Sequence, residues 1–167
     1  MKFKLIIISA LLSFSVLTCG CGKDAELTKY EEEVTAFIDS VGDIKLQMEE
    51  IDINSDSAIV DTLICLDQMQ EQFYLLSEMD VPKEFASVES LADEASEYMT
   101  EAVAIYHEVF EADEYDAANA DVAAQNYDRA MKRLSYISTL LQGELPEDEN
   151  LIITEEEVLD FEPVTEE

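Results

Sequence analysis

The sequence predicts an all-α protein, an antiparallel four-helix bundle followed by an acidic and mostly disordered C-terminal tail. The first observation is a series of four segments in which apolar residues recur three and four positions apart, the spacing of one helix face. The second is a scarcity of helix breakers, since the 167 residues include only four glycines and three prolines. The third is that no stretch of useful length shows the apolar and polar alternation of a half-buried strand.

The first expected helix, residues 27–51, has the most regular apolar seam. Its members are spaced 3, 4, 3, 4, 3, 4 and 3 positions apart: Leu27, Tyr30, Val34, Phe37, Val41, Ile44, Met48 and Ile51. Heptad spacing of this kind places every member on one face, which predicts a helix packed along its whole length. Gly42 weakens this helix by about 1 kcal/mol relative to alanine.

The second and third helices follow from start signals and further seams. The second is expected to begin after residues 54–57, a cluster of capping residue types, with Ile59, Leu63, Leu66, Met69, Phe73, Leu76 and Met79 on one face. The third is expected to begin at Pro82, because proline is favoured at the first helical position. Its seam consists of Val88, Ala92, Ala95, Met99, Ala102, Tyr106 and Val109. The alanines predict close approach by a neighbouring helix.

The fourth helix is expected from about Asp116 to Gln142, and Gly143 and Pro146 are its stop signals. Its inward residues are Ala123, Tyr127, Ala130, Leu134, Ile137 and Leu141. Short connections place successive helices side by side and antiparallel, so residues 27–143 are interpreted as an up-down-up-down bundle. Two separate helical hairpins are the alternative arrangement.

The tail, residues 144–167, carries eleven acids and no base, a composition typical of disorder. Thr154 and Glu157 could form a capping box for a short helix. The apolar residues between positions 151 and 161 leave open whether the tail docks on the bundle or is a solvated spacer.

The N-terminal residues have the layout of an export signal. Lys2 and Lys4 form a short positive segment, and residues 5–17 contain only apolar side chains, alanine and serine. A helix over this stretch is about 20 Å long at ~1.5 Å per residue, too short for a ~30 Å hydrocarbon core. The stretch therefore matches the apolar region of a signal peptide.

The six residues Leu17-Thr18-Cys19-Gly20-Cys21-Gly22 resemble the lipobox of bacterial lipoproteins. The resemblance covers residues 1 to about 22, and Thr18 departs from the leucine that is commonest at its position. It implies that residues 1–20 are removed as a signal peptide and that the Cys21 thiol carries a diacylglyceryl group.

Two alternatives to this attachment site stay open. Gly20 is the favoured small residue before Cys21, whereas Cys19 follows a less usual Thr18 and is the second candidate. An ordinary secretory signal with chance cysteines is the other alternative. With Cys21 lipidated, residues 21–26 form a tether, and two acyl chains hold a protein stably on a membrane.

The chain is strongly acidic, with 40 Asp and Glu residues against nine Lys and Arg, for a net charge of −31. This balance argues against a nucleic-acid partner, because phosphate binding needs clustered Lys and Arg. It also argues against adsorption on anionic lipid. The charge is consistent with solubility in a crowded envelope, or with a cationic partner or divalent ions.

One candidate metal site lies between the first two helices. Asp52, Asn54 and Asp56 have a spacing that resembles part of an EF-hand calcium loop. Ser57 stands where that loop has its turn glycine, and Leu63 stands where it has a bidentate glutamate. A loop followed by a helix cap is therefore the competing interpretation.

Two further residues are candidates for chemistry. His107 is the only histidine, and Ala104 stands three residues before it in place of the glutamate of a di-iron motif, so we expect a partly exposed histidine rather than a ligand. Cys65 lies in the apolar run from Leu63 to Leu66, so we expect a buried small apolar residue rather than a nucleophile.

The sequence shows no Ser/His/Asp set and no phosphate-binding glycine loop, so it predicts a non-enzymatic protein without a cofactor. The predicted function is a lipid-anchored module on the extracytoplasmic face of the cell membrane that binds an envelope or extracellular protein. A bundle that binds a ligand or divalent ions is the alternative. Five tyrosines in or between the last two helices suggest a protein-facing patch: Tyr98, Tyr106, Tyr115, Tyr127 and Tyr136.

Overall fold

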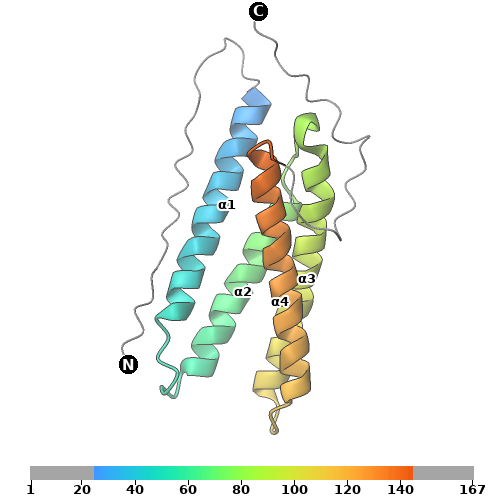
Figure 1. Ribbon diagram of the computed structural model, residues 1–167. Helices are drawn as coiled ribbons and strands as arrows, with labels where there is room; N and C mark the ends of the chain where they lie inside the picture. Colours follow the sequence, from blue (N-terminus) through green and yellow to red (C-terminus); the bar gives the residue numbers. More distant parts are fainter. Residues whose placement is uncertain (1–24, 145–167) are drawn as a thin grey trace, which may run out of the picture.

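The computed structural model describes residues 25–144. The predictions for the signal peptide, for Cys19 and Cys21, and for the tail beyond Glu144 lie outside these residues. The described chain forms α1 (Ala25–Glu49), α2 (Ala58–Ser77), the short 3-10 helix η1 (Lys83–Phe85), α3 (Ala86–Glu111) and α4 (Ala117–Leu141), and residues 25–144 contain no strand. Successive helices run in opposite directions, which confirms the antiparallel four-helix bundle (Figure 1).

One hydrophobic core joins all four helices, which excludes two independent hairpins as the arrangement. The predicted seam of α1 is buried at Tyr30, Val34, Phe37, Val41 and Ile44, each exposing no more than 6% of its surface. Phe37 meets Phe73 of α2 edge to face, with ring centroids 5.6 Å apart and planes at 83°. This geometry is the favourable one for an aromatic pair.

The helices are not equally close to one another. The tightest pair is α3 and α4, followed by α2 with α3 and then α1 with α2, whereas the backbones of α1 and α4 come close at few positions. Small residues explain the tight pair, because Ala92, Ala95, Ala102, Ala123 and Ala130 are all at most 2% exposed. The predicted close approach on the alanine seam of α3 is confirmed, and α4 is thereby held to α3 rather than to α1.

The expected start of the third helix was wrong. Pro82 is extended, with φ −60° and ψ 150°, and η1 comes between it and the first residue of α3, Ala86. Phe85 ends η1 at φ −119° and ψ 27°, outside the helical region, and its ring lies 6.0 Å from that of Tyr30. The break in the helix lets the Phe85 side chain pack against α1.

Ile59 was expected on the buried face of α2, but half of its surface is exposed. It lies in the first turn of α2, one turn before Leu63, which is the first buried residue of that helix. Apolar spacing predicts which face of a helix is buried, but not how far along that helix its neighbours extend. The error therefore falls at the end of the seam.

Both ends of α4 lie where the sequence predicted them, and both are capped. The Asp116 carboxylate accepts hydrogen bonds from the backbone N–H groups of Ala118 and Asn119, at 2.9 and 3.2 Å. At the other end Gly143 has φ +75°, and the N–H groups of Gly143 and Glu144 bond the carbonyls of Leu140 and Thr139 at 2.9 and 3.1 Å. This pair of bonds is a Schellman motif, and it ends the helix.

Replacing Asp116 by alanine is expected to destabilise the protein by about 0.5–2 kcal/mol, because two N–H groups at the start of α4 lose their acceptor. Asp116→Asn removes the same negative charge but keeps a capping oxygen, so it should cost much less. Urea unfolding of the two variants measures the difference. Equal destabilisation would mean that the charge, and not the cap, is what matters at this position.

Candidate functional site

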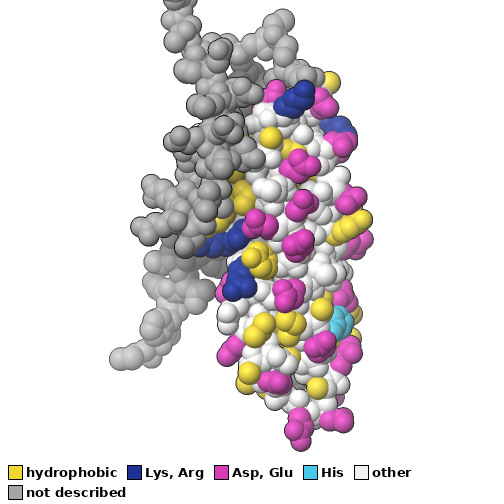
Figure 2. Space-filling model, turned by 90° about the vertical axis from the view of Figure 1, so that its right-hand side faces the viewer, with side chains coloured by type: hydrophobic (Ala, Val, Ile, Leu, Met, Phe, Trp, Pro, Cys, Tyr) yellow, Lys and Arg dark blue, Asp and Glu magenta, His cyan; other side chains and the backbone are white. Residues whose placement is uncertain are grey.

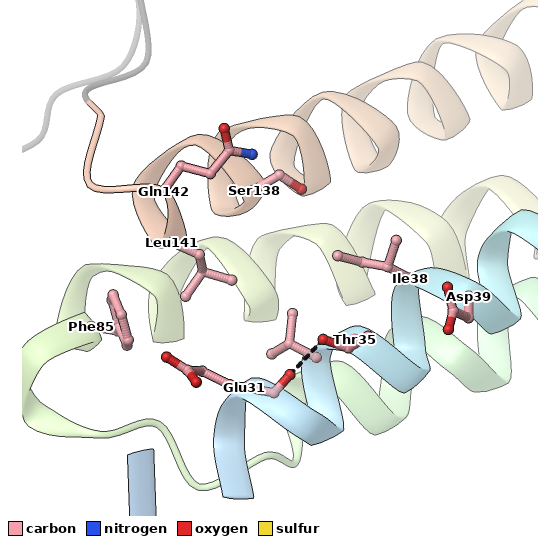
Figure 3. Close-up of a pocket in the computed structure, with 9 residues that line it drawn as sticks. Glu31, Thr35, Ile38, Asp39, Phe85, Ser138, Leu141 and Gln142 are labelled. Carbon is pink, nitrogen blue, oxygen red and sulfur yellow. Dashed lines mark hydrogen bonds between the residues drawn. The ribbon is translucent and has the colours of Figure 1, made fainter. Parts of the chain in front are cut away.

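A groove between α1 and α4 is the candidate binding site of the described structure. Its volume is about 190 Å³. Five lining residues come from α1, one from η1, two from α4 and one from the position directly after α4: Glu31, Val34, Thr35, Ile38, Asp39, Phe85, Ser138, Leu141 and Gln142. Figure 3 shows Leu141 extending from α4 toward α1, with Phe85 near one end of the gap and Ile38 near the other.

The groove has an apolar lining and a polar rim. Val34 is 3% exposed and belongs to the core, whereas Ile38 is 40% exposed. Phe85 and Leu141 complete the apolar surface, and both pack against the core. The rim includes the carboxylates of Glu31 and Asp39, and the Thr35 hydroxyl donates to the Glu31 carbonyl at 2.7 Å.

The packing of the helices explains why the gap exists. The alanine contacts hold α4 against α3, and the Phe37–Phe73 contact holds α1 against α2. The side chains of α1 and α4 that face each other do not fill the space between the two pairs. An empty apolar volume of about 150 Å³ is enough for a benzene-sized molecule, so this groove admits one or two large apolar side chains.

Tyr30 lies next to this site. Its ring packs on Phe85, its hydroxyl is buried without a hydrogen-bond partner among residues 25–144, and burial raises the pKa of Tyr30 to about 12. A buried donor without a partner costs on the order of 1–3 kcal/mol. Tyr30 therefore acts as an apolar ring at this end of the core, with no role for its ionised form.

Sequence reasoning missed most of the groove. Val34 and Leu141 appeared in the predicted seams, but Ile38, Phe85 and the polar rim did not. The one available signal was Ile38, a large apolar residue directly after the seam residue Phe37 and off the predicted buried face. Nothing in the periodicity indicated that α1 and α4 would stand apart.

His107 is partly exposed, as expected, and it links two helices. Its Nε2 lies 2.8 Å from an oxygen of Asp67 on α2, and its Nδ1 lies 3.1 Å from an oxygen of Glu111 on its own helix. These two hydrogen bonds, that to Asp67 first, raise the pKa of His107 above its usual 6.5. Sequence reasoning looked for a carboxylate before His107, whereas Glu111 follows it and Asp67 is 40 residues away.

This contact predicts a pH-dependent stability. Because the folded pKa of His107 is raised, its contribution is fully present below about pH 6.5 and is lost as pH rises through the folded value. We expect His107→Gln to destabilise by less than about 1 kcal/mol at pH 5.5, since the pair is partly exposed, and by almost nothing at pH 8.5. Thermal unfolding at both pH values measures this.

Glu108→Gln is the matched control, because Glu108 is an exposed neighbour of His107 on α3. The difference between this variant and the parent should not show the same dependence on pH. A His107→Gln effect that is as large at pH 8.5 as at pH 5.5 would contradict the charged contact with Asp67.

The candidate metal residues Asp52, Asn54 and Asp56 lie in the loop between α1 and α2. One Asp52 oxygen accepts both the backbone N–H and the side-chain amide of Asn54, at 3.0 and 3.2 Å. The bond from the Asn54 backbone, and then that from its side chain, lower the pKa of Asp52. Ser57 precedes α2 but makes no side-chain cap, and its hydroxyl donates to Asp61 at 2.7 Å.

Residues 25–144 contain no group of three or more His, Cys, Asp and Glu side chains that could hold a metal ion. Cys65 is 6% exposed, as predicted for a small apolar residue. Burial, with the nearby Asp61 charge, raises the pKa of its thiol. None of the four described helices is long and apolar enough to cross a membrane.

The five tyrosines do not form one exposed patch. Tyr136 is buried, whereas Tyr98, Tyr106 and Tyr127 are half-buried. Tyr115 is 66% exposed, in the loop before α4. Tyr106 stacks on Phe110 with ring centroids 5.8 Å apart, so packing within the bundle accounts for it.

No protein-family model matches the chain, and no curated protein or solved structure matches it either.

Proposed function

We propose that this chain is a lipid-anchored, non-enzymatic protein of the extracytoplasmic membrane face, and that its α1–α4 groove binds an apolar segment of an envelope protein. The signal-peptide pattern and the lipobox resemblance at Cys21 support the anchor. The observation that carries the binding role is the groove, an apolar surface left between two helices of an otherwise closely packed bundle.

The chemistry of the groove indicates the kind of partner. Burying the half-exposed Ile38 and the neighbouring apolar lining contributes about 25 cal/mol for each Å² removed from water. The carboxylates of Glu31 and Asp39 border this surface. A segment with one or two large apolar side chains flanked by Lys or Arg fits both features, and the net charge of −31 favours its approach.

The position of the groove along α1 supports a partner close to the membrane. The proposed lipid site, Cys21, is four residues before the first residue of α1. Along α1 the groove spans Glu31 to Asp39, which begins about 9 Å and ends about 21 Å from Ala25 at ~1.5 Å per residue. A tether of four residues adds at most about 14 Å. The partner is therefore expected to stand at the same membrane surface.

Site-specific photo-cross-linking in intact cells tests this proposal. A photoreactive amino acid replaces either Ile38 on α1 or Gln142 directly after α4, on the two sides of the groove. The control positions are Ile64 and Val122, which are 49% and 43% exposed on other surfaces. We expect both groove positions, and neither control, to capture the same envelope protein.

A second variant then tests whether the apolar lining is responsible. Ile38→Asp should abolish capture from position 142, whereas Ile64→Asp should leave it unchanged. Capture that is equal from all four positions, or absent from both groove positions, would contradict a partner in the groove.

A small apolar ligand is the second candidate function, because about 190 Å³ of largely apolar volume also accommodates a molecule of that size. Titration of the purified protein with a fluorescent apolar probe distinguishes the two. Binding of the probe that Ile38→Asp removes, together with no captured protein, would favour the ligand.

A further inference from the structure

The positive charges of the described chain are concentrated on one stretch of α4. Residues 25–144 contain 29 acids and six bases, and three of those bases, Arg129, Lys132 and Arg133, lie within five positions. From residue 129 to residue 143 there is no acid at all. Figure 2 shows acidic side chains spread over this side of the molecule, while dark blue side chains lie at its left edge and at its top. An isolated basic surface on so acidic a chain is a distinct feature.

Each of the three cations lies over an aromatic ring. The guanidinium carbons of Arg129 and Arg133 lie 5.6 and 5.3 Å from the ring centroid of Tyr98 on α3. The Lys132 ammonium lies 5.6 Å from the ring centroid of Tyr136. These contacts are within the range of cation–π attraction. We call Tyr98, Arg129, Lys132, Arg133 and Tyr136 the basic surface.

The arginines of the basic surface have donors beyond their bonds inside the bundle. The Nε of Arg133 donates to Glu94 at 2.8 Å, and one Nη of Arg129 donates to Asn126 at 3.1 Å. A guanidinium has five N–H donors in a rigid fork that matches a carboxylate. Each arginine can therefore bind a further carboxylate while it keeps the bond that positions it.

A strongly acidic segment begins where this helix ends. Residues 144–167 contain eleven acids and no base, and they begin at the Schellman motif that ends α4. Arg133 and Arg129 lie nine and thirteen residues before Gln142, or about 14 and 20 Å along the helix. An extended chain covers these distances in about four to six residues. Counted from Gly143, that reach ends at Glu147, Asp148 and Glu149.

We propose that the basic surface is the docking site of the chain's own acidic segment, residues 147–149. A separate polyanion is repelled by a chain of charge −31, but an attached segment is present at an effective concentration in the millimolar range. Each exposed ion pair contributes little, so docking requires several carboxylates together and weakens with salt. Docking covers the part of α4 to which another acidic segment could bind.

The groove does not compete for this segment. Its rim includes Glu31 and Asp39, which repel an acidic chain. Ser138, which lines the groove, is five positions from Arg133 and thus about 140° around α4. The groove remains accessible to its partner whether or not the segment is docked. The proposal for the groove and the proposal for the basic surface can therefore each fail without the other.

Paramagnetic relaxation in NMR spectra tests the docking in the full mature chain. A spin label is attached through Asn150→Cys, with Cys21→Ser and Cys65→Ala so that no other thiol reacts. At about 0.01 M salt, where the Debye length is ~30 Å, we expect amide signals of residues 129–133 to lose more than half of their intensity. At about 1 M salt, where it is ~3 Å, those intensities should recover.

Two charge variants with the same change in net charge test the specificity. Replacing Arg129, Lys132 and Arg133 by glutamine should abolish the effect on neighbouring α4 signals. Replacing Lys29, Lys45 and Lys83 by glutamine should leave it intact. Because Arg133→Gln removes the bond to Glu94 and could loosen α4, Glu147→Gln with Asp148→Asn and Glu149→Gln repeats the test with the bundle unchanged.

Several outcomes would overturn the proposal. One is no loss of signal intensity at low salt, and another is the same response of the signals in both triple glutamine variants. A loss of intensity centred on Ile38 and Leu141 would instead place the tail in the groove. Loss that appears only when labelled chains are mixed with isotope-enriched unlabelled chains would show that a second copy, and not the same chain, supplies the segment.

Discussion

Replacing Cys21 by serine is expected to move the protein from the membrane fraction to the culture medium or periplasm. The serine hydroxyl does not replace the thiol as the acceptor of the diacylglyceryl group, so the proposed anchor is lost. Each buried methylene of an acyl chain contributes about 0.8 kcal/mol, so two chains supply far more than the affinity needed for stable attachment. The fraction of protein in washed membranes, and labelling by radioactive palmitate, measure the change.

Cys19→Ser is the matched control, because it alters a cysteine only two residues away in the same segment. This variant should be lipidated and retained like the parent. The opposite result, release by Cys19→Ser and retention of Cys21→Ser, would move the attachment site to Cys19. Retention of both single variants and of the double variant would contradict a lipid anchor in this segment.

The fold was largely predictable because apolar periodicity reports directly on helix faces. The seam from Tyr30 to Ile44 was predicted residue by residue, and all its members are buried. The start of α4 near Asp116 and its stop at Gly143 were also predicted correctly, since the capping at each end depends on local chemistry. The two errors, at Pro82 and Ile59, concern features that depend on neighbouring helices and not on local chemistry. These features are the packing of Phe85 against Tyr30 and the point at which a packed face ends.

The candidate groove could not be predicted, because it also depends on how neighbouring helices are placed. It arises from the spacing of α1 and α4, whose lining residues Ile38 and Ser138 are one hundred positions apart in the chain. A sequence pattern indicates that Ala95 and Ala130 allow close packing, but it does not say which helix pair remains apart in consequence. His107 is a similar case, because its contact with Asp67 joins two helices whose register no local pattern specifies.

Replacing Phe73 by alanine is expected to cost about 3–5 kcal/mol of unfolding free energy, the range for deleting a buried aromatic ring. Phe73 on α2 is fully buried, and its ring supports Phe37 of α1 edge to face. The loss is a large part of the roughly 5–15 kcal/mol that stabilises a domain of this size. We expect the melting temperature to fall by about 10 °C or more.

Tyr74→Ala is the control for this prediction, because Tyr74 adjoins Phe73 on α2 but is 54% exposed. It should change stability by no more than about 0.5 kcal/mol. Comparable losses for the two variants would contradict the packing of α1 on α2. If Phe73→Ala has the larger effect, it should also weaken capture from Gln142 in the photo-cross-linking experiment, because the same contact holds α1, and therefore Ile38, opposite α4.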